Sequence, residues 1–258
     1  MRSIRIFQPL PARPARVFQA LTDPRELASW QADHVKGRVA RGRTIDLEWP
    51  KLGVTLALEV TEVVPEQRVV MTHSSARLEL SVVNGGVELC HTAPFDDDSL
   101  AGTESSWRVA LAMLATYLGR HTDRARRVHW SVARAAGSPE LCHAYFTESA
   151  LLSSWLGTTE RAIGPVGSNV NLSLGPGLRV RGPVIAHVPG RDVAVRWRDA
   201  DDSVLVLRTL PDPFSETGRT VLIGWSRWSE LPSADDVVRE LDAAAERLGR
   251  RLSGLFQA

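Results

Sequence analysis

The 258-residue sequence repeats itself once, and this repeat constrains the fold more than any other feature. The pattern Pro-x7-Thr-x4-Leu-x-Ser-Trp begins at Pro14 and begins again, 125 positions later, at Pro139. A second pattern, Val-Pro-x3-Val, begins at Val64 and again at Val188. Self-similarity at a nearly constant offset is typical of a duplicated structural unit. The sequence therefore predicts two homologous domains.

The predicted domains are residues 1–125 and 126–258, each long enough to bury a core of its own. Charge is balanced within both: the first carries 15 basic and 15 acidic residues, and the second carries 16 and 15. With a formal net charge of +1 and 43% hydrophobic residues, the chain is not disordered. Nucleic-acid binding through bulk positive charge is also excluded, so we expect no nucleic-acid partner.

The cysteine content and the apolar segments indicate where the protein resides. Cys90 and Cys142 are far apart and form no CxxC motif, which fits a reducing compartment. Residues 1–16 lack the apolar stretch of a signal peptide. The most apolar segment, residues 109–115, is far shorter than the roughly 20 residues of a membrane span. We therefore expect a cytoplasmic protein without a membrane span.

Both halves predict the same order of elements: a strand, two short helices, several strands and a long closing helix. In the first half, a helix begins at Pro14 and ends before Asp23-Pro24, and a helical turn then extends to Trp30. Apolar alternation and turn signals such as Asn84-Gly85-Gly86 indicate strands. The predicted strands are 3–8, 43–49, 54–64, 68–73, 76–83 and 87–92. The closing helix spans 103–120, with an apolar stripe at Trp107, Leu111, Leu114 and Leu118.

The closing helix of the second half is marked clearly. Ser233 is a suitable N-cap, and Asp235 and Asp236 follow in the first turn, where the helix dipole favours acidic side chains. An apolar face then extends to Leu255 and Phe256. Strands outnumber helices and do not alternate with them, which predicts an α+β fold with antiparallel sheets.

The opening motif resembles a known superfamily. The string P-x2-V-F-x-A-L-T-D-P-x2-L-x2-W from Pro14, with Leu-x-His-Thr from Leu89 ahead of a long helix, is similar to the START-like (SRPBCC) superfamily. That group includes birch-pollen-allergen proteins and polyketide cyclases, and the branch most similar here is that of activators of the heat-shock-protein-90 ATPase. The resemblance covers residues 1–121. The second half matches more weakly, because Glu148-Ser149 replaces Asp-Pro.

The resemblance implies two tandem helix-grip domains, each a curved antiparallel sheet wrapped around a long C-terminal helix. In this superfamily the space between sheet and helix often holds a hydrophobic small molecule. The functions of its members differ, so the fold implies a class of ligand rather than a reaction.

His91 is the main candidate for contacting such a ligand. If Val87, Leu89 and His91 face the helix, the imidazole points inward near the end of its strand and can bond a ligand. The alternative is a structural histidine bonded to a backbone carbonyl. The same two interpretations apply to His73, which follows Val69 and Met71 in alternation.

Tryptophan is unusually abundant, with eight residues against two tyrosines. Trp30 and Trp155 occupy equivalent positions in the repeat and are interpreted as core residues. In the second half, alternation places Trp197 and Arg208 in the same interior, where the guanidinium could hold an anionic group; an out-of-phase strand is the alternative. Trp225 could line the pocket or belong to an exposed patch. The predicted ligand-binding residues are Trp49, His73, Leu89, His91, Trp107, Leu111, Trp197, Arg208 and Trp225.

The remaining motifs predict neither a metal nor a cofactor. The acidic run 96–98 lacks the spacing of a calcium loop and is better interpreted as a solvated loop before a helix. No metal-ligand spacing, nucleophile elbow, P-loop or dinucleotide fingerprint is present. The Gly-Pro segments near 164–167 and 175–177 are interpreted as turns.

The leading hypothesis is a protein that binds a hydrophobic small molecule, without an assigned reaction. The first alternative is a polyketide aromatase/cyclase-like enzyme, with His91, Glu79, Arg108 and Arg208 as candidate catalytic residues. The second alternative is an interaction protein that activates a chaperone ATPase. A protein partner or a homodimer is compatible with each of these hypotheses.

Overall fold

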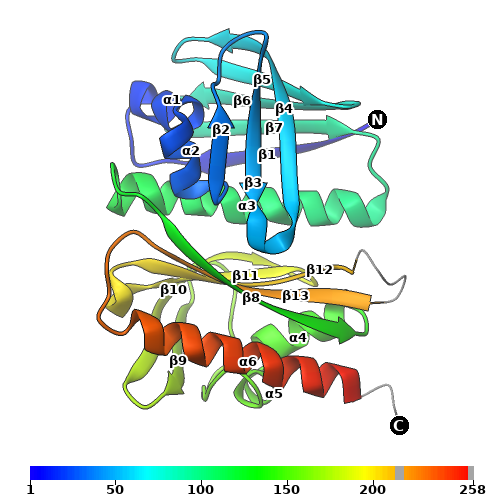
Figure 1. The fold of residues 1–258 in the computed structure, drawn as a ribbon, viewed down its shortest axis with the longest axis vertical. Helices are drawn as coiled ribbons and strands as arrows, with labels where there is room; N and C mark the ends of the chain where they lie inside the picture. Colours follow the sequence, from blue (N-terminus) through cyan, green and yellow to red (C-terminus); the bar gives the residue numbers. More distant parts are fainter. Residues whose placement is uncertain (213–217, 255–258) are drawn as a thin grey trace. The chain divides into compact units, whose positions relative to one another are not determined.

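The chain divides into two compact units, Met1–Arg127 and Val128–Ala258 (Figure 1). The structure, a computed structural model, describes residues 1–212 and 218–254. Leu255 and Phe256, predicted to extend the last apolar face, lie outside the described residues.

Unit 1 is a seven-stranded antiparallel sheet with a long helix packed on it, in the order β1-β7-β6-β5-β4-β3-β2. Its strands are β1 (Arg2–Pro9), β2 (His34–Gly37), β3 (Arg43–Trp49), β4 (Val54–Val64), β5 (Arg68–His73), β6 (Ala76–Val83) and β7 (Gly86–Ala93). Its helices are α1 (Pro14–Thr22), α2 (Pro24–Trp30), the 3-10 turn η1 (Pro50–Leu52) and α3 (Asp97–Arg120).

Local signals determine where these helices begin and end. Pro14 opens α1 in the first turn, where its missing N–H is not needed. Asp23 ends α1 and caps α2, because its carboxylate accepts the N–H of Arg25 at 2.8 Å. Helix α3 begins at Asp97, six residues before the predicted start, because Asp96 and Ser99 form a capping box. The acidic run is thus the start of the helix rather than a loop.

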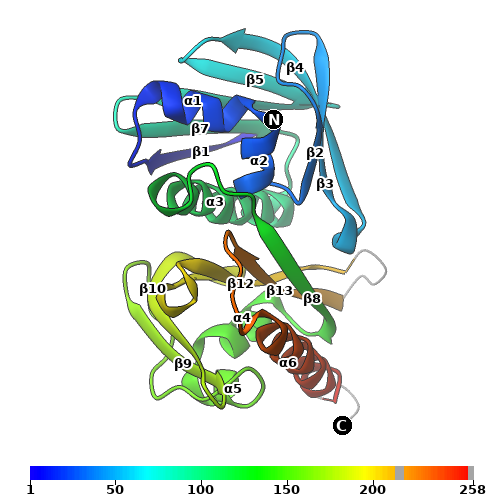
Figure 2. The same ribbon diagram turned by 60° about the vertical axis from the view of Figure 1, so that its left-hand side comes forward.

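The core of unit 1 lies between the concave face of the sheet and α3 (Figures 1 and 2). Alternate strand residues point toward the helix and are almost fully buried: Ile4, Ile6, Leu78, Leu80, Val87 and Leu89. The stripe predicted on the closing helix is buried as well, which confirms the helix-grip arrangement.

Unit 2 has a six-stranded antiparallel sheet in the order β8-β13-β12-β11-β10-β9. Its strands are β8 (Arg127–Ala136), β9 (Asn169–Gly175), β10 (Leu178–Val188), β11 (Asp192–Trp197), β12 (Ser203–Pro211) and β13 (Gly218–Arg227). Its helices are α4 (Pro139–Thr147), α5 (Ser149–Ser153), the 3-10 turn η2 (Arg198–Ala200) and α6 (Ala234–Gly254). The fold is therefore α+β with two curved antiparallel sheets, as predicted.

A buried tryptophan follows the same pattern in the helix pair α1–α2 of unit 1 and in the helix pair α4–α5 of unit 2. Trp30 is 1% exposed and its indole N–H donates to the carbonyl of Ala20 at 2.9 Å. Trp155 is also 1% exposed and donates to the carbonyl of Tyr145 at 2.8 Å. Each acceptor lies ten residues before its tryptophan, so both residues are core elements, as the repeat indicates.

The units differ at one edge of the sheet. In unit 1, β2 pairs with β3 over four residues. In unit 2, the segment that follows α5 pairs with the edge of β9 through a single bridge among the described residues, between Thr158 and Ser173. The segment then turns away from this strand. Within the described residues, no helix combines the length and apolar character needed to cross a membrane.

Candidate ligand-binding site

The structure brings His91 and Trp107 together at the interface between the sheet and α3. His91 lies near the end of β7 on the same face as Leu89, and Trp107 lies in the first half of α3. The indole N–H donates to Nδ1 of His91 over 3.0 Å. Phe95 stands edge-on to the imidazole, with the ring centroids 5.2 Å apart.

This contact determines which nitrogen of His91 carries the proton. The indole nitrogen can only donate, so Nδ1 must accept and the proton of the neutral ring resides on Nε2. Burial lowers the pKa of His91, which keeps the ring neutral at pH 7. Nε2–H has no protein acceptor among the described residues and is available as a hydrogen-bond donor.

The other predicted lining residues of unit 1 differ in their surroundings. Leu89 is 1% exposed and Leu111 is fully buried, so both belong to the packed core beneath the His91–Trp107 pair. Trp49 ends β3 on the face that also carries Ile45 and Leu47, and it is partly exposed.

Three predicted candidates of unit 1 do not point into the interior. His73 is exposed at the end of β5, where Nδ1 lies 2.8 Å from the carbonyl oxygen of Ala57, so its inward placement is wrong and the structural interpretation applies. Glu79 lies on the face of β6 opposite its core residues, and a hydrogen bond from Arg77 lowers its pKa. Arg108 is exposed on α3 and pairs with Glu104 at 2.7 Å.

In unit 2, the predicted interior position of Arg208 is also wrong. Its guanidinium forms two hydrogen bonds, of 3.0 and 2.9 Å, with Asp192 on the adjacent strand, and Asp192 is 2% exposed. The core residues of β12 are Leu205 and Leu207, which alternate with Arg208. The strand is therefore out of phase with the prediction.

Trp197 and Trp225 are core residues of unit 2, with ring centroids 6.1 Å apart. The Trp197 indole donates to the carbonyl of Arg179 at 2.8 Å, and the Trp225 indole donates to Ser203 at 3.0 Å. Trp225 is 1% exposed, which contradicts the alternative of an exposed aromatic patch at this residue.

Sequence reasoning missed a histidine pair in unit 2. His143 on α4 and His187 on β10 pack against each other, with ring centroids 5.1 Å apart and ring planes tilted by 31°. Burial, with a further contribution from His187, lowers the pKa of His143 to about 4. Its Nε2 is buried without a hydrogen-bond partner among the described residues. The two histidines are 44 positions apart and belong to no common pattern, so no sequence signal joins them.

A Ser-His-Asp grouping in unit 2 does not have the arrangement of a catalytic triad. His129 Nε2 lies 3.1 Å from Ser131 Oγ and 2.9 Å from Asp242 Oδ1, while Ser131 itself donates to Asp242. In a triad the serine and the acid bond opposite ring nitrogens. Here both share one nitrogen, so the grouping fastens β8 to α6.

The thiols have contrasting environments. Cys90, on β7, is partly exposed and alternates with the inward residues Leu89 and His91. Cys142 is fully buried on α4, and this burial raises the pKa of its thiol. No cluster of potential metal ligands is present within residues 1–212 and 218–254.

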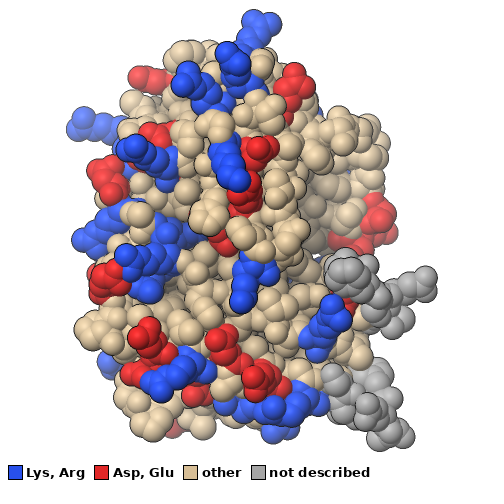
Figure 3. Space-filling model, in the orientation of Figure 1, with Lys and Arg blue, Asp and Glu red and all other residues tan. Residues whose placement is uncertain are grey.

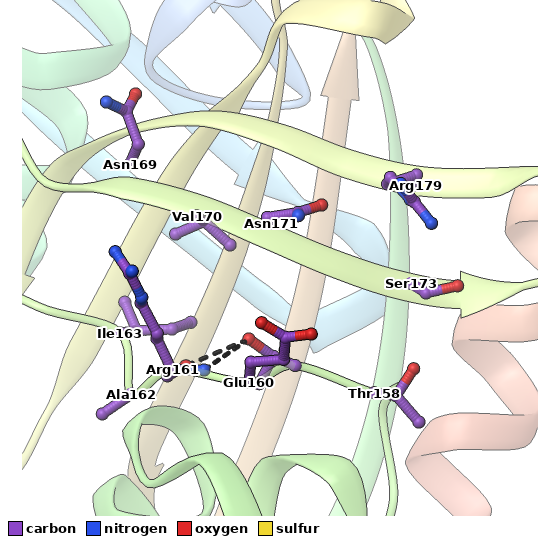
Figure 4. A pocket seen from close by; sticks show the side chains of 11 residues that line it. Thr158, Glu160, Arg161, Ala162, Ile163, Asn169, Val170, Asn171, Ser173 and Arg179 are labelled. Atoms are coloured by element: carbon purple, nitrogen blue, oxygen red, sulfur yellow. Dashed lines mark hydrogen bonds between the residues drawn. The ribbon is translucent and has the colours of Figure 1, made fainter.

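The described part of the chain has two clefts that lie outside the interfaces between the sheets and their closing helices. The cleft in unit 1, of about 530 Å³, lies between α2 and the segment after α3. Glu26 and Tyr117 line it, but the Glu26 carboxylate already accepts the Tyr117 hydroxyl at 2.9 Å and lies 2.7 Å from Arg16. The cleft in unit 2, of about 590 Å³, lies beside β9 (Figure 4). Basic and acidic side chains are interspersed on the visible surface of each unit (Figure 3).

The sheet order, the closing helices and the buried helix stripe define the fold class: an α+β protein with two helix-grip units, each an antiparallel sheet closed by a long helix. The family model described as "Activator of Hsp90 ATPase homolog 1-like protein" matches residues 11–119. Residues 11–119 are therefore similar to that family, in agreement with the resemblance of the opening motif. No curated protein sequence matches the chain.

Several solved structures are similar to the chain at low sequence identity. DynU16, described as a putative protein in the dynemicin biosynthetic locus, is 18% identical over 97% of both chains, with a TM-score of 0.42. The Aha1 dimer from Colwellia psychrerythraea is 21% identical over 46% of this chain and 96% of its own, with a TM-score of 0.41. SSP2350 from Staphylococcus saprophyticus is 21% identical over 46% and 92%, with a TM-score of 0.40.

Proposed function

We propose that unit 1 binds a small aromatic or apolar molecule that carries one hydrogen-bond acceptor. The observation that supports this proposal is the His91–Trp107 hydrogen bond, which leaves the Nε2–H of a neutral imidazole without a protein acceptor among the described residues. A hydrogen-bond donor placed among aromatic rings is typical of a small-molecule site, in which a few polar groups orient an apolar ligand.

The roles of the surrounding residues follow from their burial. Trp107 and Phe95 offer ring edges to the ligand, and Trp107 also fixes the tautomer of His91. Leu89 and Leu111 are packed too closely to contact a ligand without rearrangement, so they form the base of the site. The ligand would enter at the His91 end of the interface between β7 and α3.

A matched pair of probes tests this function. 2-Acetonaphthone carries a carbonyl acceptor, and naphthalene has the same ring system without one. We expect 2-acetonaphthone to bind about five- to tenfold more tightly, since one net hydrogen bond contributes about 1 kcal/mol. The measurement is fluorescence titration, together with the NMR shift of the His91 Nε2 signal.

The variant His91→Phe should remove the preference and leave naphthalene binding intact. Trp107→Phe should weaken the preference, because Nδ1 loses the donor that holds the tautomer. Equal affinities for both probes in the wild type, or a preference that survives His91→Phe, would overturn the proposal. Absence of saturable binding by either probe would overturn it as well.

The cyclase-like alternative retains one of its four candidate residues. His91 could still position a carbonyl compound, but Glu79, Arg108 and Arg208 each bond a charged neighbour outside the sheet–helix interface. A catalytic proposal would therefore need His91 to act without them.

We propose chaperone ATPase activation as a second candidate, supported by the family match over residues 11–119. The full chain, added to a purified heat-shock-protein-90, should raise its ATPase rate at least twofold in a coupled-enzyme assay. An unchanged rate at a tenfold molar excess would remove this candidate without affecting the ligand-binding proposal.

A further inference from the structure

Unit 1 contains a strand at a position that unit 2 leaves open. In unit 1, β2 covers the edge of β3, from the pair His34–Glu48 to the pair Gly37–Ile45. In unit 2, β9 takes the place of β3 in the sheet, at the margin beside β10 (Figure 2). Among the described residues, only Thr158 pairs with this outer edge of β9, and it does so at Ser173.

The backbone groups of β9 are arranged to continue this pairing. Ser173 both donates to and accepts from Thr158, at 2.9 Å in each direction. Strand backbone groups alternate in direction with a period of two, so the N–H and C=O of Asn171 and Asn169 point to the same edge. Among the described residues, no hydrogen bond uses these groups. The edge therefore has unused donors and acceptors.

A groove of about 590 Å³ lies along this edge, a volume in the range of ligand sites (Figure 4). The segment after Thr158 forms its other wall. A turn in which Thr159 Oγ1 donates to the carbonyl of Arg161 at 3.0 Å directs this segment away from β9, and Ile163 then bonds Thr147 on α4. The groove thus lies where a covering strand would be.

The charged groups of the groove favour an acidic occupant. Arg161 and Arg179 line it, both are exposed, and neither forms an ion pair within the described part of the chain. Glu160 is the one acidic residue among the lining side chains. Unit 1 has the opposite distribution of charge, with the basic residue on the covering strand and the acidic residue on the strand it covers. There, Lys36 on β2 bonds Glu48 on β3 at 2.7 Å.

We propose that the β9 edge binds a short extended segment of a partner protein that carries acidic side chains. The segment adds to the sheet at the position that β2 occupies in unit 1, with backbone hydrogen bonds to Asn169 and Asn171. Residues 169–173 accommodate about four residues of partner, or about 13 Å. A second copy of β9 is a poorer occupant, because its outward side chains there, Asn169, Asn171 and Ser173, include no acid.

Residues 169–173 also lack most of the features that usually prevent strand addition. Proteins protect free edges with lysine, proline, bulges or inward charges. Asn169 to Ser173 include no lysine, proline or inward charge, and the register shift of β9 lies beyond them, between Ser173 and Gly175. An edge of this kind is expected to have an occupant.

Selection from phage-displayed random heptapeptides, followed by anisotropy measurements on the selected peptides, tests the proposal with the full-length protein. We expect enriched sequences to combine Asp or Glu with β-branched residues. Asn171→Pro should weaken their binding at least tenfold. This substitution removes the edge-facing N–H but leaves the hydrogen bonds to β10 intact, and edge strands tolerate proline.

Two further variants make the outcome decisive. Arg161→Ala with Arg179→Ala alters only exposed side chains and should also weaken binding at least tenfold, whereas the distant Arg250→Ala should leave it unchanged. If circular dichroism shows that the Asn171→Pro variant does not fold, the binding measured with the double arginine variant tests the proposal. The proposal is overturned if no acidic family is enriched, if the selected peptides bind the arginine variant as well as the wild type, or if sedimentation reveals a dimer that Asn171→Pro abolishes.

Discussion

At the scale of single residues, the protein contains two histidines whose surroundings favour the neutral ring for different reasons. His91 is partly buried and accepts a hydrogen bond from Trp107, so protonation would set its Nδ1–H against the indole N–H. His143 is 9% exposed and has a neighbouring imidazole, His187, in place of a donor. The first arrangement provides an oriented donor, whereas the second makes unit 2 sensitive to acid.

His143 should weaken unit 2 as the pH falls. Its pKa is about 4 in the folded state and near 6.5 when unfolded, so between these values the unfolded chain binds a proton that the folded chain does not. Stability is therefore complete above about pH 6.5 and declines toward pH 4. Converted to free energy, the whole difference between the folded and unfolded pKa values corresponds to about 3 kcal/mol of stability. Solvent screening near the surface reduces this loss to about 2 kcal/mol.

The comparison of wild type with His143→Leu by urea denaturation at pH 7 and pH 4 measures this effect. The leucine variant should lose about 2 kcal/mol less than the wild type over that range. The nearby Glu140 and Asp192 carboxylates favour the protonated ring and are retained in both proteins. Parallel losses in the two proteins would show that His143 does not titrate as described.

At the scale of elements, Asp23 acts at the junction of two helices. It ends α1, and its side chain caps α2 by accepting the Arg25 N–H. Its counterpart in unit 2, Glu148, stands at the start of α5 and makes no capping bond. The junction at Glu148 therefore serves as an uncapped control for the capped junction at Asp23.

Asp23→Ala should lower the free energy of unfolding of unit 1 by about 1 kcal/mol, the usual cost of an N-cap. Glu148→Ala should cost no more than a few tenths of that amount. Chemical denaturation of both variants provides the comparison. An equal loss in the two would mean that the Asp23 hydrogen bond contributes nothing beyond helix propensity.

Elements with a strong pattern could be predicted from the sequence, and those without one could not. The strands of unit 1 alternate clearly, so their inward faces and the stripe on α3 were predictable. On β12, both the residues at 204 and 206 and those at 205 and 207 are apolar, so alternation could not establish the phase, and Arg208 was assigned to the wrong face. Strand β2 was not predicted, since it exists through its pairing with β3 rather than through its own composition.

The candidate site was predictable only in part. His91, Trp107, Leu89 and Leu111 follow from periodicity, because each belongs to an unambiguous inward face. The bond between His91 and Trp107 depends on how β7 packs on α3, which no local pattern contains. The β9 groove is lined mostly by exposed polar side chains, which resemble any other surface loop in sequence.

At the scale of the whole molecule, the two closing tryptophans allow the units to be compared directly. Trp30→Phe and Trp155→Phe each remove a buried indole N–H bond and leave unfilled volume, at a cost of about 2 kcal/mol. Hydrogen exchange measured by mass spectrometry should reveal faster exchange in peptides 1–127 for the first variant and in peptides 128–254 for the second. Faster exchange throughout the chain for either variant would show that the two units unfold together.

The contrast between the two thiols makes the molecule suitable for labelling without engineering. Cys142 is fully buried and protonated at neutral pH, so Cys90 is the single site where a maleimide dye or spin label should attach rapidly. An Ellman titration should count one fast thiol in the native protein and two in guanidinium chloride. Since Cys90 precedes His91 on β7 but points to the opposite face, a fluorophore placed there would report on occupancy of the site from outside it.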